Sequence, residues 1–446
     1  MTRMPEPQIL SAKAHQRLKA DVCIVGAGVT GSALAAMLGE NGLSVIVVEK
    51  DLRSTERIVG ELLQPDGVKK LREMGLSDCL EEIDAQIIRG YYLRKGEASC
   101  TIPYPEHAES GRAFHHHLFI DRLRGRLRSC ERIQLLEARV LRLNEKQGRI
   151  TGAEARDTEG LTWVIEAPLT ILSDGMQSTL RAQYHQNTPE RTGYFIGLIL
   201  KNCPLPSPGH GHVFLTESSP YLCYPISSGE IRMLVDFRGE SPPRKGSAEV
   251  MARFSEVEKT LPDVLLPAFR EAVGGRYFKV MPNHRLPAEG FKRQKGLTMI
   301  GDALNMRHPL TGGGMTAGLT GACQLGKAIL QLSREGKWGT AEADQRINRM
   351  PSAPNAPINI LADALYAVFR HPQLSAACIA YLQSSPFRAR GPVQLLAGLS
   401  RSRRLLYYHF FAVAFFGAFR RGSGLSLTRR WELIKDARNI LRPLIG

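Results

Sequence analysis

The chain lacks several features that mark small, secreted or repetitive proteins. Its 446 residues include 8 cysteines, none closer than 20 residues to the next, so neither a CxxC metal or redox motif nor a disulfide framework is expected. Residues 1–20 contain no apolar run of the kind that forms the core of a signal peptide. No internal repeat, low-complexity stretch, Ser-His-Asp arrangement or catalytic pair of carboxylates stands out. We therefore expect a globular chain of two or three domains with reduced thiols.

Acidic residues are scarce relative to basic ones. Lys and Arg number 59 against 43 Asp and Glu, which gives a formal net charge of +16. Residues 388–446 hold twelve basic residues and two acidic ones, Glu432 and Asp436. Such an asymmetry indicates a nucleic-acid or membrane-surface partner. Because no recognition-helix, RRM, KH or zinc-finger pattern accompanies the charge, we expect a membrane surface and no nucleic acid.

The first strong motif is a strand, a glycine-rich turn, a small-residue helix and a second strand that ends in Glu49. Gly26 makes the tight turn, Gly28 lets the backbone approach a pyrophosphate, and Gly31 lets the helix pack on the strand. The helix N-terminus offers free N–H groups to the phosphates. Glu49 is placed to accept a hydrogen bond from a ribose 2′-hydroxyl. The unit predicts dinucleotide binding and leaves NAD and FAD open.

Two later segments resemble further dinucleotide contacts. Each is an apolar strand followed by a turn, Ser173-Asp174-Gly175 in one case and Gly301-Asp302 in the other. Either could instead be an ordinary surface turn. The second is soon followed by Gly312, Gly313 and Gly314 and then by a predicted helix at residues 316–332. Three glycines before a helix favour close backbone approach to a planar ligand such as a reduced isoalloxazine ring, with the helix dipole aimed at developing negative charge.

The rest of the sequence predicts a second sheet and a helical C-terminal region. Residues 191–239 carry apolar, strand-like segments separated by Gly, Pro and Ser, which favours a largely antiparallel sheet. Residues 350–357 are expected to be a linker. Residues 405–419 carry no formal charge and lie between arginine pairs; as a helix they would span about 22 Å, short of the ~30 Å hydrocarbon core. They predict an interfacial anchor, with a buried core helix as the alternative.

The three motifs, in this order, resemble the nucleotide contacts of single-component flavoprotein monooxygenases related to aromatic hydroxylases. Within that class, residues 57–65, 110–116, 235–239 and above all 305–315 resemble the squalene monooxygenase (squalene epoxidase) family. Residues 391–400 and 409–414 resemble the family's C-terminal helices, so the similarity runs from about Asp21 to Phe419. Two departures are Asp66, where the family usually has a glycine, and the absence of the N-terminal membrane-spanning extension of many eukaryotic members.

The resemblance implies an α/β fold with a Rossmann-like FAD-binding domain of the aromatic hydroxylase type. We expect that domain to be discontinuous, built from residues 20–85, 120–185 and 285–350. A second, mainly antiparallel substrate-binding domain would comprise residues 86–119 and 186–284. Residues 351–446 would form a C-terminal helical region associated with the membrane.

The resemblance also implies site residues. FAD would contact the motif residues Glu49, Asp174, Gly301, Asp302, Gly313 and Gly314, and in addition Lys50, Arg57, Arg124, Val140 and Met315. Tyr91 matches a family tyrosine that hydrogen-bonds a glutamine matching Gln64 beside the flavin, and these two are the expected catalytic residues. The substrate channel would be lined by Leu222, Tyr224, Pro309, Leu310, His409 and Phe410, although Leu222 and Tyr224 could equally be core residues. No metal is expected: His115, His116 and His117 would alternate faces in a strand.

The activity that the resemblance implies is epoxidation of the terminal double bond of squalene by O₂ to give 2,3-oxidosqualene. In the family's mechanism, reduced FAD forms a C4a-hydroperoxide whose distal oxygen is transferred. Electrons would come from NADPH through a partner reductase, and C-terminal helices would anchor a peripheral or monotopic protein on the cytoplasmic face of a membrane. Alternatives are another flavin monooxygenase or reductase acting on a polyprenoid or quinone, and a non-catalytic basic binding protein with a nucleotide fold.

Overall fold

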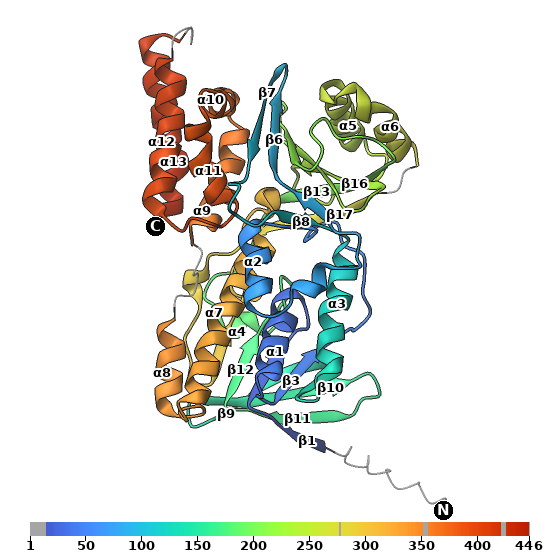
Figure 1. Ribbon diagram of the computed structural model, residues 1–446, viewed down its shortest axis with the longest axis vertical. Helices are drawn as coiled ribbons and strands as arrows, with labels where there is room; N and C mark the ends of the chain where they lie inside the picture. Colours follow the sequence, from blue (N-terminus) through green and yellow to red (C-terminus); the bar gives the residue numbers. More distant parts are fainter. Residues whose placement is uncertain (1–14, 276–277, 351–355, 421–424, 446) are drawn as a thin grey trace, which may run out of the picture.

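Two large sheets with their covering helices, a small third sheet and a C-terminal helical bundle make up the described part of the molecule (Figure 1). The computed structural model describes residues 15–275, 278–350, 356–420 and 425–445. Most of the segment in which a signal peptide was not expected, residues 1–14 of 1–20, and most of the predicted linker, residues 351–355, lie outside the described residues.

The larger sheet has eight strands and carries the dinucleotide motifs. Its strand order is β1 (His15–Lys19), β11 (Thr162–Glu166), β10 (Arg149–Asp157), β9 (Ile133–Lys146), β3 (Val45–Glu49), β2 (Val22–Val25), β12 (Leu169–Leu172) and β18 (Leu297–Met299). From β9 to β18 every neighbouring pair is parallel. The short central strands are apolar and fully buried, which is the pattern of a parallel sheet covered on both faces. The carboxyl ends of β2, β3, β12 and β18, and the turns that follow them, therefore meet at one edge.

Helices pack on this sheet along its length. The first helix, α1 (Val29–Glu40), is nearly all buried and packs against α3 (His116–Ser129) and α7 (Gly314–Arg334). α2 (Pro65–Glu73) and α8 (Ala341–Arg349) pack on α7 from the outside. A single apolar cluster joins these helices to the strands. Small residues in α1 let the glycine-rich turn sit close to the neighbouring strands.

The second sheet has seven strands and lies above the first in Figure 1. Its order is β17 (Lys279–Arg285), β13 (Glu190–Lys201), β16 (Glu230–Phe237), β15 (Tyr221–Pro225), β14 (Gly211–Phe214), β6 (Gly90–Lys95) and β7 (Ala98–Pro103). All pairs are antiparallel except β14 with β6. The predicted α/β architecture with a second, mainly antiparallel sheet is confirmed. A small sheet of β4 (Leu62–Leu63), β8 (Gly111–Ala113) and β5 (Gln86–Ile88) connects the two layers.

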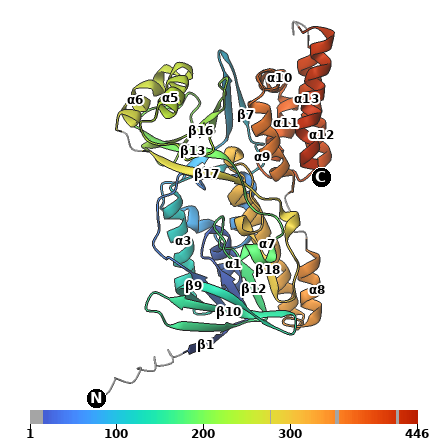
Figure 2. The same cartoon turned by 180° about the vertical axis from the view of Figure 1, so that it is seen from behind.

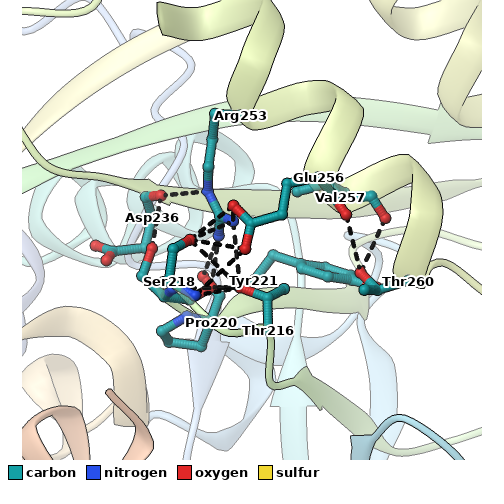
Figure 3. A network of polar contacts seen from close by, with 10 residues as sticks. Thr216, Ser218, Pro220, Tyr221, Asp236, Arg253, Glu256, Val257 and Thr260 are labelled. Carbon is teal, nitrogen blue, oxygen red and sulfur yellow. Dashed lines mark hydrogen bonds and ion pairs between the residues drawn. The ribbon is translucent and has the colours of Figure 1, made fainter. Parts of the chain in front are cut away.

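One face of the second sheet is covered by α5 (Ala248–Thr260) and α6 (Leu266–Gly274). A buried guanidinium fixes this packing: Arg253 of α5 donates to the carbonyl oxygens of Ser219 and Asp236 and pairs with Glu256 (Figure 3). Because these acceptors lie on the loop before β15 and on β16, the network ties α5 to the sheet.

The C-terminal helices stand beside the β6–β7 hairpin in both views of the molecule (Figures 1 and 2). They are α9 (Ala356–Phe369), α10 (Pro372–Gln383), α11 (Pro386–Leu396), α12 (Arg403–Phe419) and α13 (Leu427–Ile445). Apolar residues of α10, α11, α12 and α13 share one cluster with β6, β7 and β15. Within the described residues, every helix is too short or too polar to cross a bilayer. The described side chains of α12 form a buried face and an exposed face, so the segment is in part a core helix, and its role as an interfacial anchor stays a prediction.

One local expectation is wrong. His116 and His117 begin α3 and His115 is its N-cap, so these residues do not form a strand. Among the described residues, no three His, Cys, Asp or Glu side chains are grouped as metal ligands. Asp66 lies in the first turn of α2, where a glycine would bring no conformational advantage. The boundaries proposed for the domains remain a prediction.

Candidate active site

A cavity of about 770 Å³ lies between the two sheets, at the edge where the dinucleotide motifs meet. We call it the large cavity. Residues expected to contact the cofactor line it: Gly26, Gly28, Glu49, Lys50, Arg57, Arg124, Val140, Asp174, Asp302, Gly314 and Met315. Of the expected substrate residues, Leu222, Tyr224, Pro309 and Leu310 line it as well. The sequence therefore identified widely separated segments that the fold brings to one cavity.

The glycine-rich turn has the close contacts that its motif requires. Gly26 has a φ of +104°, and a Cβ there would lie 2.6 Å from the carbonyl oxygen of Ser173. A Cβ on Gly31 would lie 2.0 Å from the carbonyl oxygen of Gly26, so the helix can approach the turn only at glycine. A Cβ on Gly28 would instead enter open space in the large cavity. The backbone at the start of α1 is thus open to a ligand.

Glu49 holds the end of β3 against this turn. Its Oε2 accepts a hydrogen bond from the Ala27 backbone N–H at 2.8 Å. The buried Arg124 of α3 donates to the carbonyl oxygens of Ala27 and Leu52 and lies 3.9 Å from Glu49 Oε2. Glu49 and Arg124 therefore stabilise the loop that frames the cavity, in addition to lining it.

The second and third motifs are tied together by an arginine that the sequence did not single out. Arg181 donates to the backbone carbonyls of Gly175, Met176 and Asp302. Burial raises the pKa values of Asp174 and Asp302, and Asp174 Oδ1 has no hydrogen-bond partner among the described residues. Nothing in the sequence around Arg181 marks it, because its acceptors come from loops far apart in the chain.

The glycines before α7 form a second open backbone segment. Gly312 has a φ of +61°, and Gly313 is the N-cap of α7 with no side-chain cap. A Cβ on Gly314 would meet no atom within 4 Å, in the large cavity. Gly31, Gly301 and Gly313 do not line this cavity; they are the glycines that let the turns and helices pack. The free N–H groups of α7 thus face the same space as those of α1.

Gln64 and Tyr91 meet at the inner wall of the large cavity. Gln64 Nε2 donates to Tyr91 Oη and to the carbonyl oxygen of Thr311. Tyr104, which sequence reasoning missed, donates from its hydroxyl to Gln64 Oε1 at 2.6 Å. Gln64 is completely buried. The predicted pairing of Gln64 and Tyr91 is present in the structure, and their catalytic role remains a prediction.

A second, almost wholly apolar cavity lies beyond this wall, between the second sheet and the C-terminal helices. We call it the apolar pocket. Tyr91, Val213 and Leu310 line both the pocket and the large cavity, so they form a shared wall. His409 and Phe410 of α12 line the pocket only, whereas Leu222, Tyr224 and Pro309 line only the large cavity; Leu310 is the expected substrate residue that borders both. The Tyr381 hydroxyl and His409 Nδ1 lie 2.9 Å apart, and burial lowers the pKa of His409.

A buried ion pair supports the floor of the large cavity. Arg232 of β16 binds Glu61 through two hydrogen bonds, Nε to Oε2 at 2.8 Å and Nη2 to Oε1 at 2.9 Å. Tyr224 donates to the same carboxylate at 3.3 Å. Glu61 precedes β4, so this pair joins the two layers beneath the cavity. Tyr224 therefore has a structural contact as well as a place in the cavity lining.

The large cavity suits an extended dinucleotide. Backbone N–H groups at two helix starts, α1 and α7, open onto it, and Gly28 and Gly314 leave room where side chains would intrude. The buried Asp174 oxygen without a partner offers an acceptor. Basic residues that line the cavity, the exposed Arg57 and the buried Arg124, complement phosphate charge. The donor set and the shape thus fit FAD.

Comparisons with known proteins give the family. The squalene epoxidase family model matches residues 166–427. Squalene epoxidase 3 of Arabidopsis thaliana is 39% identical over 441 residues, which cover 95% of this chain and 84% of the relative. Squalene epoxidase erg1 of Schizosaccharomyces pombe is 36% identical, covering 90% of each chain, and rat squalene monooxygenase is 37% identical, covering 90% of this chain and 71% of the relative.

Solved structures share the fold at lower identity. The flavin-dependent brominase Bmp2 aligns with a TM-score of 0.70 at 16% identity, covering 89% of this chain and 98% of the brominase. PqsL, a probable FAD-dependent monooxygenase of Pseudomonas aeruginosa, aligns with a TM-score of 0.66 at 21% identity, covering 80% and 98%. These structures share the fold alone, whereas the family model and the curated relatives show that the chain belongs to the squalene epoxidase family.

Proposed function

We propose that the protein is an FAD-dependent squalene epoxidase, which uses O₂ to convert the terminal double bond of squalene to 2,3-oxidosqualene. The observation that carries the proposal is the wall shared by two cavities of different chemistry. On one side lies the large cavity, lined by the dinucleotide motifs and by several charged side chains, and on the other the apolar pocket. Tyr91 and Leu310 border both, so a hydrocarbon in the pocket would lie beside the cavity that would hold the cofactor.

FAD would be held by the residues of the large cavity: Gly26, Gly28, Glu49, Lys50, Arg57, Arg124, Val140, Asp174, Asp302, Gly314 and Met315. Gly31, Gly301 and Gly313 would shape the turns around it. When bound and reduced, FAD supplies the electrons with which O₂ is activated. The glycine turn before α7 and the positive end of the helix dipole would stabilise negative charge on the reduced ring.

The protein's own residues bind and orient the alkene. Epoxidation of an alkene requires no acidic proton and no leaving group, which agrees with a pocket lined by apolar side chains. Leu310, Phe410 and Val413 would bind the hydrocarbon and exclude water. Tyr91, which is hydrogen-bonded to Gln64, is a polar side chain that lines both cavities.

Electrons would reach the flavin from NADPH through a partner reductase. The support for this proposal is the sequence, which carries one GxGxxG unit, at Gly26–Gly31, and no separate NADPH-binding segment that we recognise. The C-terminal helices would attach the protein peripherally to the cytoplasmic face of a membrane. Exposed aromatic side chains on α12 and α13, among them Tyr408, Phe415, Phe419 and Trp431, support that attachment.

Product analysis tests the proposal. Purified protein with FAD, a reducing system, squalene and O₂ is expected to form 2,3-oxidosqualene, identified by mass spectrometry; anaerobic incubation is the control. A yellow, FAD-binding protein that makes no oxidosqualene but converts a polyprenoid or quinone would instead favour another flavin enzyme. A protein that binds no FAD and binds nucleic acid in a salt-sensitive way would favour a non-catalytic role. Family membership favours neither alternative.

A further inference from the structure

The orientation of the Gln64 amide is fixed by its neighbours. The carbonyl oxygen of Thr311 lies 2.6 Å from one end of the amide, and a carbonyl can only accept a hydrogen bond. That end must therefore be Nε2, and the other end must be Oε1. Oε1 lies 2.6 Å from the Tyr104 hydroxyl, which must donate to it. Because Gln64 is completely buried, no water competes for these bonds.

This orientation decides what the Tyr91 hydroxyl can do. The second hydrogen of Gln64 Nε2 points to Tyr91 Oη, so Tyr91 accepts from Gln64. Its own proton is then available to another acceptor. The carbonyl oxygen of Thr311, 3.4 Å away, accepts it only weakly, and the neighbouring Tyr104 hydroxyl, itself a donor to Gln64, is the other protein group that interacts with the Tyr91 hydroxyl. Tyr91 lines both cavities, so a ligand there can accept this proton.

Burial keeps the two tyrosines in place and protonated. Their rings are both buried and meet edge to face, with centroids 6.1 Å apart. Burial raises the pKa of Tyr91 to about 12 and that of Tyr104 well above its usual value. Both hydroxyls therefore remain donors at any physiological pH.

We propose that Tyr104 is a positioning residue for the reaction: its hydroxyl holds Gln64 in the one orientation that makes Tyr91 a hydrogen-bond donor toward the bound reactants. The proposal rests on the proposed function, since the reactants are those of the epoxidation. The order of donation is Tyr104 to Gln64, Gln64 to Tyr91, and Tyr91 to a ligand in the cavities. Tyr104 itself lines neither cavity and acts only through this series of hydrogen bonds.

Tyr104→Phe removes the hydroxyl and keeps the ring. We expect kcat to fall about tenfold, the size of effect that loss of one buried hydrogen bond can have, with the FAD dissociation constant and the unfolding temperature little changed. Tyr91→Phe should also lower kcat and leave FAD bound. In the Tyr91→Phe background, Tyr104→Phe should have almost no further effect on kcat, because the last donor in the series of hydrogen bonds is already missing.

If the two substitutions lower kcat independently, so that their fold-changes multiply in the double variant, the proposal is overturned. A wild-type kcat in Tyr104→Phe would overturn it as well. Tyr92→Phe, the next residue on β6, is the matched control and should behave as wild type.

The visible absorption spectrum of bound FAD tests the role of Tyr104 without any substrate. Tyr104→Phe is expected to shift it in the same direction as Tyr91→Phe, and a spectrum identical to wild type would contradict the proposal. If the wild-type protein binds FAD but makes no oxidosqualene, the proposed function fails while this comparison still decides the role of Tyr104.

Gln64→Glu provides a second variant should Tyr104→Phe fold poorly. An ionised carboxylate accepts only and draws the Tyr91 proton to itself, whereas a protonated carboxyl can donate again. Its burial should raise the pKa of the introduced carboxyl. We therefore expect the kcat of Gln64→Glu to fall as the pH rises through that titration, a transition that wild type lacks. A pH profile with the same shape as that of wild type would overturn the proposal.

Discussion

Asp302 lines the large cavity with its side chain exposed to that space, and Arg57, Arg181 and Arg307 lie around it. Desolvation raises its pKa, and these positive charges oppose that effect. Asp302→Ala should weaken FAD binding about tenfold or more, because it removes a charged group at the place where the cofactor is proposed to bind. Spectrophotometric titration of the apoprotein with FAD measures the change. Asp263→Ala, at an exposed carboxylate far from the cavity, is the control, and full FAD occupancy in Asp302→Ala after dialysis would contradict this placement.

The buried, hydrogen-bonded ring of His212 should make the free energy of unfolding depend on pH. Its Nε2 accepts from the Ser207 backbone N–H at 3.1 Å, and its Nδ1 lies 3.0 Å from the His210 carbonyl oxygen. This arrangement fits only the neutral ring, and burial lowers its pKa to about 4. The unfolded chain takes up a proton below about pH 6.5, so the free energy of unfolding should fall as the pH falls from 6.5 toward 4.

The loss assigned to His212 is about 2 kcal/mol between pH 7.5 and pH 5. Urea unfolding at the two pH values measures it. His212→Gln should lose less stability over that interval than wild type, while His107→Gln, at an exposed histidine, should match wild type. An equal loss in wild type and in His212→Gln would show that other groups cause the pH dependence.

At the scale of elements, the approach of α11 to α12 depends on Gly391. A Cβ there would lie 1.9 Å from Nε2 of His409, the residue that lines the apolar pocket. Gly391→Ala should therefore separate the two helices and destabilise the protein by about 1–3 kcal/mol, as overpacking of a core does. It should also raise the KM for squalene, since the pocket wall moves.

Gly125→Ala, the same substitution in another helix, is the matched control for this prediction. Gly125 lies within α3, is exposed, and would meet no atom within 4 Å of its Cβ. Alanine favours a helix interior over glycine by about 1 kcal/mol, so this variant should be slightly more stable than wild type. Urea unfolding of both variants distinguishes the clash from the general effect of replacing a helical glycine. A Gly391→Ala protein as stable as wild type would show that His409 can move away at little cost.

Elements with local sequence signals were predictable, and contacts between distant elements were not. The unit from β2 through α1 to β3 was predicted from a glycine spacing whose physical reasons lie within thirty residues. By contrast, the hydroxyl of Tyr104 and the guanidinium of Arg181 gain their roles only when loops far apart in the chain meet. The histidines at 115–117 were misplaced because three polar residues before an apolar run suit a strand as well as the start of α3.

At the scale of the whole molecule, the positive charge and the exposed aromatic side chains coincide on the C-terminal helices. Arg388 lies over the rings of Tyr381 and Phe416, and Arg430 lies over that of Phe419. Phe415 and Phe419 stack with their rings exposed. An anionic surface attracts each basic residue by only about 1 kcal/mol, and salt screens this attraction. An inserted Phe contributes about 1.5–3 kcal/mol, which salt does not weaken. The apolar side chains should therefore provide most of the attachment.

Binding to vesicles of mixed neutral and anionic phospholipid tests this balance. High salt alone should leave wild-type protein on the vesicles, and detergent should release it. Deleting the chain after about Ser385 should also release it, but α11, α12 and α13 share an apolar cluster with the second sheet, so deletion would damage the fold as well.

The double variant Phe415→Glu, Phe419→Glu changes only exposed side chains and should abolish salt-resistant binding. Met251→Glu, Val264→Glu, equally exposed on the far side of the second sheet, is the control and should stay bound. Complete release of wild type by salt would mean that the charge of the C-terminal helices, and not their aromatic face, holds the protein on the membrane.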